Sequence, residues 1–143
     1  NFNALQIRPM IFNTKQKMKH FISMIILMTV MAIPAFAGVL ESVTAALKHH
    51  NASELAVFFD SSVDLTILNN ESNYSKKQAE VIIQRFFNDN GATGFTLTHQ
   101  GKSPDGSMYG TGNLTTAKGT FKVYFFLKKS GAGSVIQELR FEN

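Results

Sequence analysis

The stretch YSKKQAEVIIQRFFNDNG, Tyr74 to Gly91, predicts the main helix of the fold. Ser75 and Gln78 have the spacing of a capping box at its start, and Gly91 supplies the left-handed residue that commonly ends a helix. The apolar positions recur three and four residues apart, so they form one stripe. That stripe consists of Ala79, Ile82, Ile83 and Phe86, widened by Phe87. A helix with one such stripe packs against another layer.

Two shorter helices are predicted upstream of this one. In residues 39–50 the apolar residues fall three and four apart, which is typical of one helical face. A second helix is expected over residues 53–59, with Ser53 as its N-cap. Residues 63–68, VDLTIL, alternate as a strand does, and the NNESN that follows is interpreted as a turn.

Downstream of Gly91 the pattern changes to strands. We expect strands at residues 95–100, 108–115, 121–128 and 135–141, joined by short glycine-containing turns that favour antiparallel neighbours. Helices early and strands late indicate an α+β domain, in which a curved antiparallel sheet of four or five strands wraps the N-terminal helices.

Residues 18–37 have the pattern of a cleavable signal peptide. Basic residues precede an apolar run over 21–33, and Pro34 and the triplet Ala35-Phe36-Ala37 follow it. The run is shorter than the roughly 20 residues that cross a bilayer. We therefore expect cleavage after Ala37 and export to the periplasm or beyond, with no permanent membrane anchor; an uncleaved anchor is the alternative.

The remaining domain boundaries follow from this predicted signal peptide. Residues 1–17 carry no core pattern and are interpreted as an upstream or non-native extension, with the true start at Met18 or Met10. Residues 38–143 are then one domain. Four of the fourteen Lys and Arg residues precede Gly38, and the other ten are equalled by the ten acidic residues. The exported domain is therefore neutral, which argues against a nucleic-acid partner.

Several kinds of site are excluded or disfavoured. The chain has no cysteine, so it has no disulfide, no thiolate ligand and no lipidated cysteine, and it is not a lipoprotein. His49 and His50 are adjacent on a predicted helix and point apart, so no metal site is expected there. GKSPDG lacks the spacing of a phosphate loop, and GTGNLTT lacks the third glycine of a dinucleotide site. No cofactor is expected, and Gly110 and Gly112 more simply mark a bulge or bend of the sheet.

The order of elements and five strings together resemble a known family. The strings are LAVFFDSSVDLTI, YSKKQAEVIIQRFF, FTLTHQGKS, YGTGNLTTAKGTFKVYFFLKK and IQELRFE. They are similar to the small secreted bacterial family called domain of unknown function 4783, within the nuclear transport factor two-like superfamily. The resemblance implies a cystatin-like cone with a pocket at its open end. That superfamily includes isomerases, dehydratases, ligand carriers and adaptors, so the fold alone assigns no activity and no catalytic residue.

Our first hypothesis is a non-enzymatic binding module for a small apolar ligand or a protein partner. The candidate pocket residues are Phe59, Tyr74, Phe86, His99, Tyr109 and Tyr124. Each has packing in the core as its alternative, most strongly Phe59 and Phe86. His99 is expected to face inward, because it continues the alternation of Phe95 and Leu97.

Two alternatives stay open. The first is a small-molecule isomerase or hydratase, with Asp60 or Asp64 as the base and His99 or a tyrosine as the proton donor. The second is a homodimer that assembles through the sheet.

Overall fold

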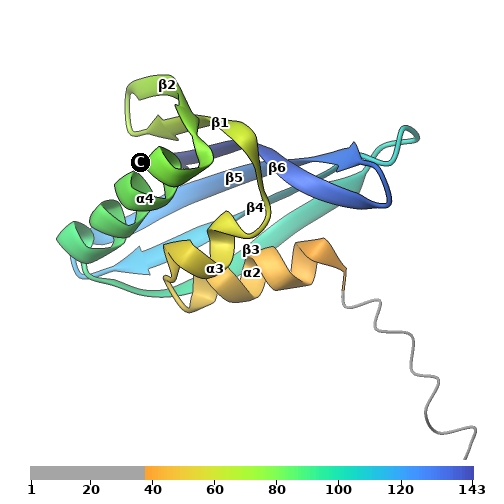
Figure 1. Ribbon diagram of the computed structural model, residues 1–143. Helices are drawn as coiled ribbons and strands as arrows, with labels where there is room; N and C mark the ends of the chain where they lie inside the picture. The colour runs from red at the N-terminus through yellow and green to blue at the C-terminus, as the bar shows by residue number, and fades with distance from the viewer. Residues whose placement is uncertain (1–37) are drawn as a thin grey trace, which may run out of the picture. The chain divides into compact units, whose positions relative to one another are not determined.

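Three helices pack on one face of a six-stranded curved sheet (Figure 1). The computed structural model describes residues 38–143, and the predicted extension and signal peptide lie outside the described residues. The helices are α2 (Val39–Lys48), α3 (Ala52–Ala56) and α4 (Lys76–Asn90). The strands are β1 (Phe59–Ile67), β2 (Asn70–Ser75), β3 (Ala92–Lys102), β4 (Met108–Thr116), β5 (Gly119–Ser130) and β6 (Gly133–Glu142). Helix α4 contacts β1 and β2, whereas α2 contacts β3 and β4.

Helix α4 begins and ends as the sequence predicts. The Ser75 side chain accepts a hydrogen bond from the Gln78 backbone N–H, and the Gln78 side chain accepts one from the Ser75 N–H. Gly91 ends the helix with φ of 64°, a left-handed conformation that glycine adopts at little cost. The capping box and the glycine therefore fix both ends of the element that covers β1 and β2.

The sheet has the strand order β2-β1-β6-β5-β4-β3. The prediction of four or five strands was too low, and the prediction of an all-antiparallel sheet was wrong, because β1 pairs in parallel with β6. The interpretation of NNESN as a turn was also wrong. Asn70–Ser75 forms β2, which pairs antiparallel with β1 through a two-residue turn at Leu68 and Asn69. The four strands predicted downstream of Gly91 are all present.

The second helix is shorter than expected and starts one residue earlier. Asn51, not Ser53, is its N-cap, and the Asn51 side-chain oxygen accepts hydrogen bonds from the N–H groups of Ser53 and Glu54. Phe59 is not helical. It begins β1, where it pairs with Ile136, so the burial of this ring against the sheet outweighs its helical spacing.

Phenylalanine rings dominate the core between α4 and the sheet. The ring of Phe86 lies 5.1 Å from Phe121 and 5.0 Å from Phe141, measured between centroids, and Phe87 meets Phe141 at 5.8 Å. Each fully buried ring contributes about 1.5–3 kcal/mol through the apolar surface that it removes from water. In residues 38–143 no buried side-chain nitrogen or oxygen lacks a hydrogen-bond partner.

Two glycines in β4 make room for this core. A Cβ on Gly110 would lie 2.3 Å from the ring of Phe125, and one on Gly112 would lie 2.4 Å from the ring of Phe95. Gly112 also stands opposite the irregularity of β3 between Leu97 and His99. The prediction that these glycines mark a bulge or bend of the sheet therefore agrees with the structure at Gly112, and close ring packing is a further reason for both glycines.

No helix within residues 38–143 combines the length and the hydropathy needed to cross a membrane.

Candidate functional site

The helix-facing side of the sheet is filled by side chains where a cone pocket was expected. Phe59 is 3% exposed and Phe86 is 7% exposed, and both belong to one continuous hydrophobic core. Phe59 is therefore packed in the core, which was the alternative to its predicted place in a pocket.

An open groove lies beside this core, between α4 and the β1–β2 hairpin. It has a volume of about 640 Å³. Its apolar residues are Leu65, Ile67, Tyr74, Ile82 and Phe86. Its polar residues are Asn69, Asn70, Glu71, Arg85, Asp89 and Asn90. We call this feature the α4 groove. It brings together two of the predicted residues, Tyr74 and Phe86.

A smaller hollow of about 270 Å³ adjoins the groove. Its lining is Tyr74, Lys77, Gln78, Val81 and Ile82. Tyr74 and Ile82 line both spaces, and both are half-buried. Val81 is 53% exposed, so its apolar side chain is accessible from solvent. We call this feature the Val81 hollow.

His99 faces away from the helices, contrary to the prediction. The register of β3 against β4 shifts between Leu97 and His99, and His99 then pairs with Thr111 rather than with an inward-facing residue. A bulge of one residue reverses the alternation beyond it, so the face that Phe95 and Leu97 share does not continue to His99. His99 is exposed.

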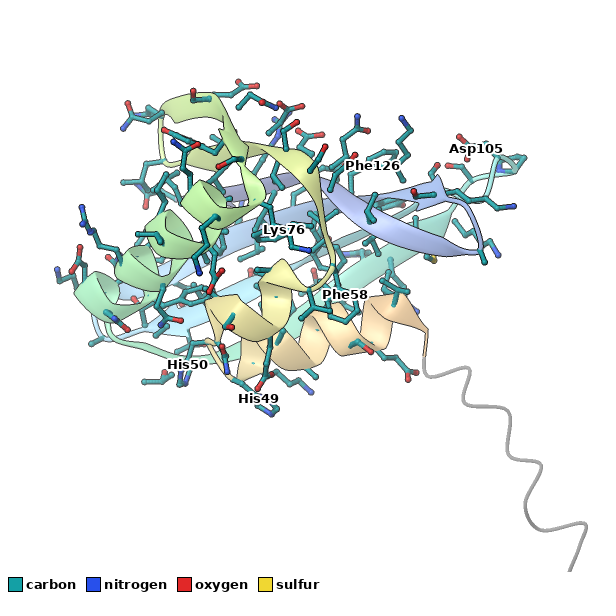
Figure 2. The ribbon with its side chains drawn as sticks, in the orientation of Figure 1. His49, His50, Phe58, Lys76, Asp105 and Phe126 are labelled. Carbon is teal, nitrogen blue, oxygen red and sulfur yellow. The ribbon has the colours of Figure 1, made fainter. Side chains whose placement is uncertain are left out.

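Tyr109 and Tyr124 also lie on this outer face, on β4 and β5. Their rings are stacked, with centroids 6.5 Å apart and 25° between the planes. The Arg140 guanidinium carbon lies 5.9 Å from the centre of the Tyr124 ring, and Arg140 forms an ion pair with Glu138. Phe126 is the cross-strand neighbour of Tyr109, and Figure 2 shows it on the side of the sheet opposite α2 and α3. We call these five residues the outer aromatic face.

The surroundings on the outer aromatic face raise the pKa of two of its residues, Tyr124 and Arg140. Partial burial, followed by the nearby carboxylate of Glu138, raises the pKa of Tyr124 above its ordinary value. The hydrogen bond from Arg140 to Glu138 likewise raises the pKa of the guanidinium, so the Arg140 charge is permanent.

His99 is not brought together with either aspartate of the enzyme alternative. Asp64 accepts a 2.7 Å hydrogen bond from the Asn73 side chain on β2, and Asp60 accepts one from the Ser61 N–H. His99 is four strands from Asp64 in the sheet, which corresponds to about 19 Å at the usual strand spacing.

Metal binding has no support in the described part of the chain. Among residues 38–143 no group of three or more His, Cys, Asp or Glu side chains could hold a metal ion. His49 and His50 lie at the end of α2, as Figure 2 shows, and His49 contacts Glu54 at 3.1 Å. The ends of α2 and α3 are thereby linked.

The charged residues of the α4 groove and of the outer aromatic face were not predicted from the sequence. Arg85 and Asp89 stand one helical turn apart on α4, a spacing that indicates a shared face, although a solvated face has the same spacing. Glu138 and Arg140 alternate with buried residues in β6, so their outward direction was readable, but their meeting with Tyr124 depends on strand order.

Comparison with known proteins gives a consistent result. Residues 40–142 match the family model described as Domain of unknown function (DUF4783). The chain is 35% identical in sequence to a DUF4783 family protein from Bacteroides uniformis. Its crystal structure superimposes with a TM-score of 0.70, and the match covers 74% of this chain and 97% of that chain. The chain is 32% identical to the one from Bacteroides ovatus, with a TM-score of 0.69 over 78% of this chain and 94% of that chain. No curated protein matches the chain.

More distant structures share only the fold. A chain of the NTF2 type is 11% identical, with a TM-score of 0.55 over 72% of this chain and 92% of that chain. A cystatin-fold protein from Novosphingobium aromaticivorans is 10% identical, with a TM-score of 0.53 over 71% and 92%. The expected nuclear transport factor two-like, cystatin-like fold is thereby confirmed. On the family model and the identities together, the chain belongs to the DUF4783 family.

Proposed function

We propose that this protein is an exported binding module without catalytic activity, and that the α4 groove is its binding site. The observation that carries the proposal is the groove itself, an apolar floor open to solvent beside a core that is otherwise filled. Binding sites are typically concave and mainly apolar, with a few polar groups that orient the ligand. The groove is concave and has an apolar floor, but its rim is more polar than is usual, with six polar residues beside five apolar ones.

The polar rim favours a ligand that is apolar in part and charged or polar at one end. Arg85 is exposed and forms no ion pair within residues 38–143, so its charge is available to an anion, which must approach it from the side away from the carboxylates of Glu71 and Asp89 on the same rim. Asn69, Asn70 and Asn90 offer both hydrogen-bond donors and acceptors. A ligand with an apolar body and an acidic group would use both parts.

Catalysis in the groove has weaker support. Glu71 and Asp89 lie on the same rim as Tyr74, so a carboxylate and a phenol are present. Both carboxylates are exposed to solvent, whereas a carboxyl group that acts as a general acid or base is usually tuned by burial. Binding therefore accounts for the groove more simply.

The groove is tested with decanoate as an apolar, anionic probe, followed by amide chemical shifts of the exported domain. We expect the largest changes at Tyr74, Ile82 and Arg85. Ile82→Glu places a carboxylate on the apolar floor of the groove, where it repels the anionic probe, and is expected to remove the response. Val57→Glu is the matched control, because Val57 is 69% exposed on the surface outside the groove. Shift changes confined to the outer aromatic face, or an unchanged response in Ile82→Glu, would exclude the groove as the site.

Export is a separate part of the proposal and rests on the pattern of residues 18–37. Intact mass spectrometry on protein from the periplasm of an expressing Gram-negative cell tests it. We expect a mass that starts at Gly38. An unprocessed mass would contradict cleavage, and absence of the protein from the periplasm would contradict export.

The outer aromatic face supports a second candidate role, a homodimer through the sheet. Tyr109 is 40% exposed and stacks on Tyr124, and aromatic side chains of this kind are enriched at protein interfaces. Sedimentation over a hundredfold range of concentration tests it. A dimer in the native chain that becomes a monomer in Tyr109→Glu supports this role, and a monomer at every concentration excludes it.

A further inference from the structure

β2 is an edge strand whose outer backbone groups are open to a further strand. Within residues 38–143, β1 is the only strand that pairs with β2, and every β2 residue except the half-buried Tyr74 is exposed. The opposite edge is less open, because α2 packs along β3 and two irregularities interrupt its register. Edge strands with free N–H and C=O groups are ready templates for pairing.

The register identifies which backbone groups are free. The two-residue turn makes Ile67 and Asn70 the hydrogen-bonded pair that closes the hairpin. Hydrogen-bonded and non-hydrogen-bonded pairs alternate along an antiparallel ladder, so the N–H and C=O groups of Glu71 and Asn73 point away from β1. Ser75 has the same phase, and its N–H is indeed taken by the Gln78 side chain rather than by β1.

The side chains beside this edge form two spaces in a row, each with an apolar part in its lining. Residues Asn70 and Glu71 of β2 line the α4 groove, and Tyr74 separates it from the Val81 hollow. A strand added to β2 would present alternate side chains to this inner face, with about 6.6–7 Å between residues i and i+2. One apolar residue could then enter the groove and the next could enter the hollow.

We infer that the partner is an extended peptide segment of another protein, which adds to β2 as a seventh strand and places apolar side chains at i and i+2 in the groove and the hollow. This inference rests on the proposed role of the α4 groove. Main-chain hydrogen bonds to Glu71 and Asn73 supply affinity, and the apolar parts of the two spaces supply specificity, as in other cases of strand addition.

A second copy of this chain fits the same edge less well. The inner-facing residues of β2 are Asn70, Ser72 and Tyr74, so a paired β2 strand would offer amide and hydroxyl groups to the apolar parts of the groove and the hollow. Burying such groups without hydrogen-bond partners is costly. A peptide with apolar residues at alternate positions avoids this cost.

The test is selection of random twelve-residue peptides, displayed on phage, against the immobilised domain. We expect enriched peptides with apolar residues at i and i+2 and micromolar affinity. In their complexes, amide hydrogen exchange of Glu71 and Asn73 should slow by at least tenfold. Exchange of Ser72 and Tyr74, already bonded to β1, should change little. Failure to enrich any such peptide, or protection that is absent from Glu71 and Asn73, would overturn the inference.

Two variants separate this inference from the proposal on which it depends. Asn73→Pro removes the outward N–H while leaving pairing with β1 intact, and proline is tolerated at such edge positions. Asn73→Ala is the matched control, because both variants lose the side-chain bond to Asp64. We expect Asn73→Pro to weaken peptide binding at least tenfold relative to Asn73→Ala. Equal affinity would overturn strand addition.

The decanoate response is read in the same two variants. If it persists while strand addition fails, the groove remains a binding site and only the peptide inference falls. If Ile82→Glu changes neither decanoate nor peptide binding, the proposed function falls as well. A dimer that forms through β2 and blocks the peptide would show that a second copy is the occupant and would also overturn the inference.

Discussion

Gly110 lies directly opposite Phe125 in the sheet, and the Phe125 ring occupies the space that a side chain at Gly110 would need. A Cβ at Gly110 would be 2.3 Å from Cζ of Phe125. On the outer face the same distance separates a Cβ at Gly101 from Cε1 of Tyr109. The neighbours differ, because Phe125 is fully buried and Tyr109 is 40% exposed.

This contrast predicts unequal costs for the same substitution. Gly110→Ala should lower the free energy of unfolding by about 1–3 kcal/mol, because a buried ring has no space into which it can move. Gly101→Ala should cost less than about 1 kcal/mol, because Tyr109 can swing toward solvent. Urea denaturation of both variants measures the difference. Equal costs would show that Tyr109 is held as firmly as the core.

Ser75→Ala should destabilise the domain through the start of α4. It removes the side-chain acceptor of the capping box and leaves the Gln78 N–H without that partner. We expect a loss of about 1 kcal/mol in the free energy of unfolding, the usual cost of losing an N-cap. Ser53→Ala is the control, because Asn51 and not Ser53 caps α3. A loss as large in Ser53→Ala would contradict the assigned caps.

The backbone of Leu68 is strained, and we predict that a substitution at this position relieves the strain. It occupies the hairpin turn with φ of 56°, a conformation that costs a leucine about 1 kcal/mol or more and that asparagine tolerates better. Leu68→Asn should therefore raise the melting temperature by a few degrees. Calorimetry on this variant and on Leu68→Ala, which keeps the strain, separates backbone relief from loss of the side chain. A lower melting temperature in Leu68→Asn would indicate that the leucine packs usefully.

The comparison of sequence and structure shows where local signals are sufficient. The capping box at Ser75 and the left-handed Gly91 fixed α4 because each acts within one helical turn. β2 was missed because NESNYS has no apolar alternation; its backbone pairs with β1 while nearly all its side chains stay in water. Such a strand is specified by its hairpin partner rather than by its own residues.

The residues that meet in the α4 groove could not be predicted from the sequence for a related reason. Tyr74 and Phe86 meet in the groove because α4 folds back over the hairpin, which no local pattern records. His99 was assigned to the wrong face because one extra residue in β3 reverses the alternation. Gly112 indicated an irregularity of the sheet near this point, but no residue of β3 itself shows where its extra residue lies.

His99→Ala should accordingly leave groove binding unchanged. The side chain is exposed on the outer face, so its loss removes no groove contact and should change the free energy of unfolding by no more than about 0.5 kcal/mol. The decanoate titration and urea denaturation measure both quantities. Loss of the decanoate response with stability intact would show that His99 contributes to the binding site.

The raised pKa of Tyr124 predicts that the domain loses stability at alkaline pH. Its pKa is raised in the folded state by burial and then by Glu138, so folding favours the neutral phenol. The stability that this group contributes is fully present below the unfolded value of about 10 and is lost as the pH rises through the folded value. Tyr124→Phe cannot ionise and should keep that contribution. We therefore expect the unfolding free energy of the native chain to fall faster than that of Tyr124→Phe above about pH 10.

Urea denaturation of both chains between pH 8 and pH 11 checks this expectation, and every other titrating group is common to the two chains and cancels in the difference. Absorbance of tyrosinate, measured as the native chain minus Tyr124→Phe, should show a midpoint above the ordinary tyrosine value. Parallel stability curves would contradict the raised pKa. Since Glu138 is the second cause of the shift, Glu138→Gln should move the midpoint back toward the ordinary value while leaving the contribution of burial in place.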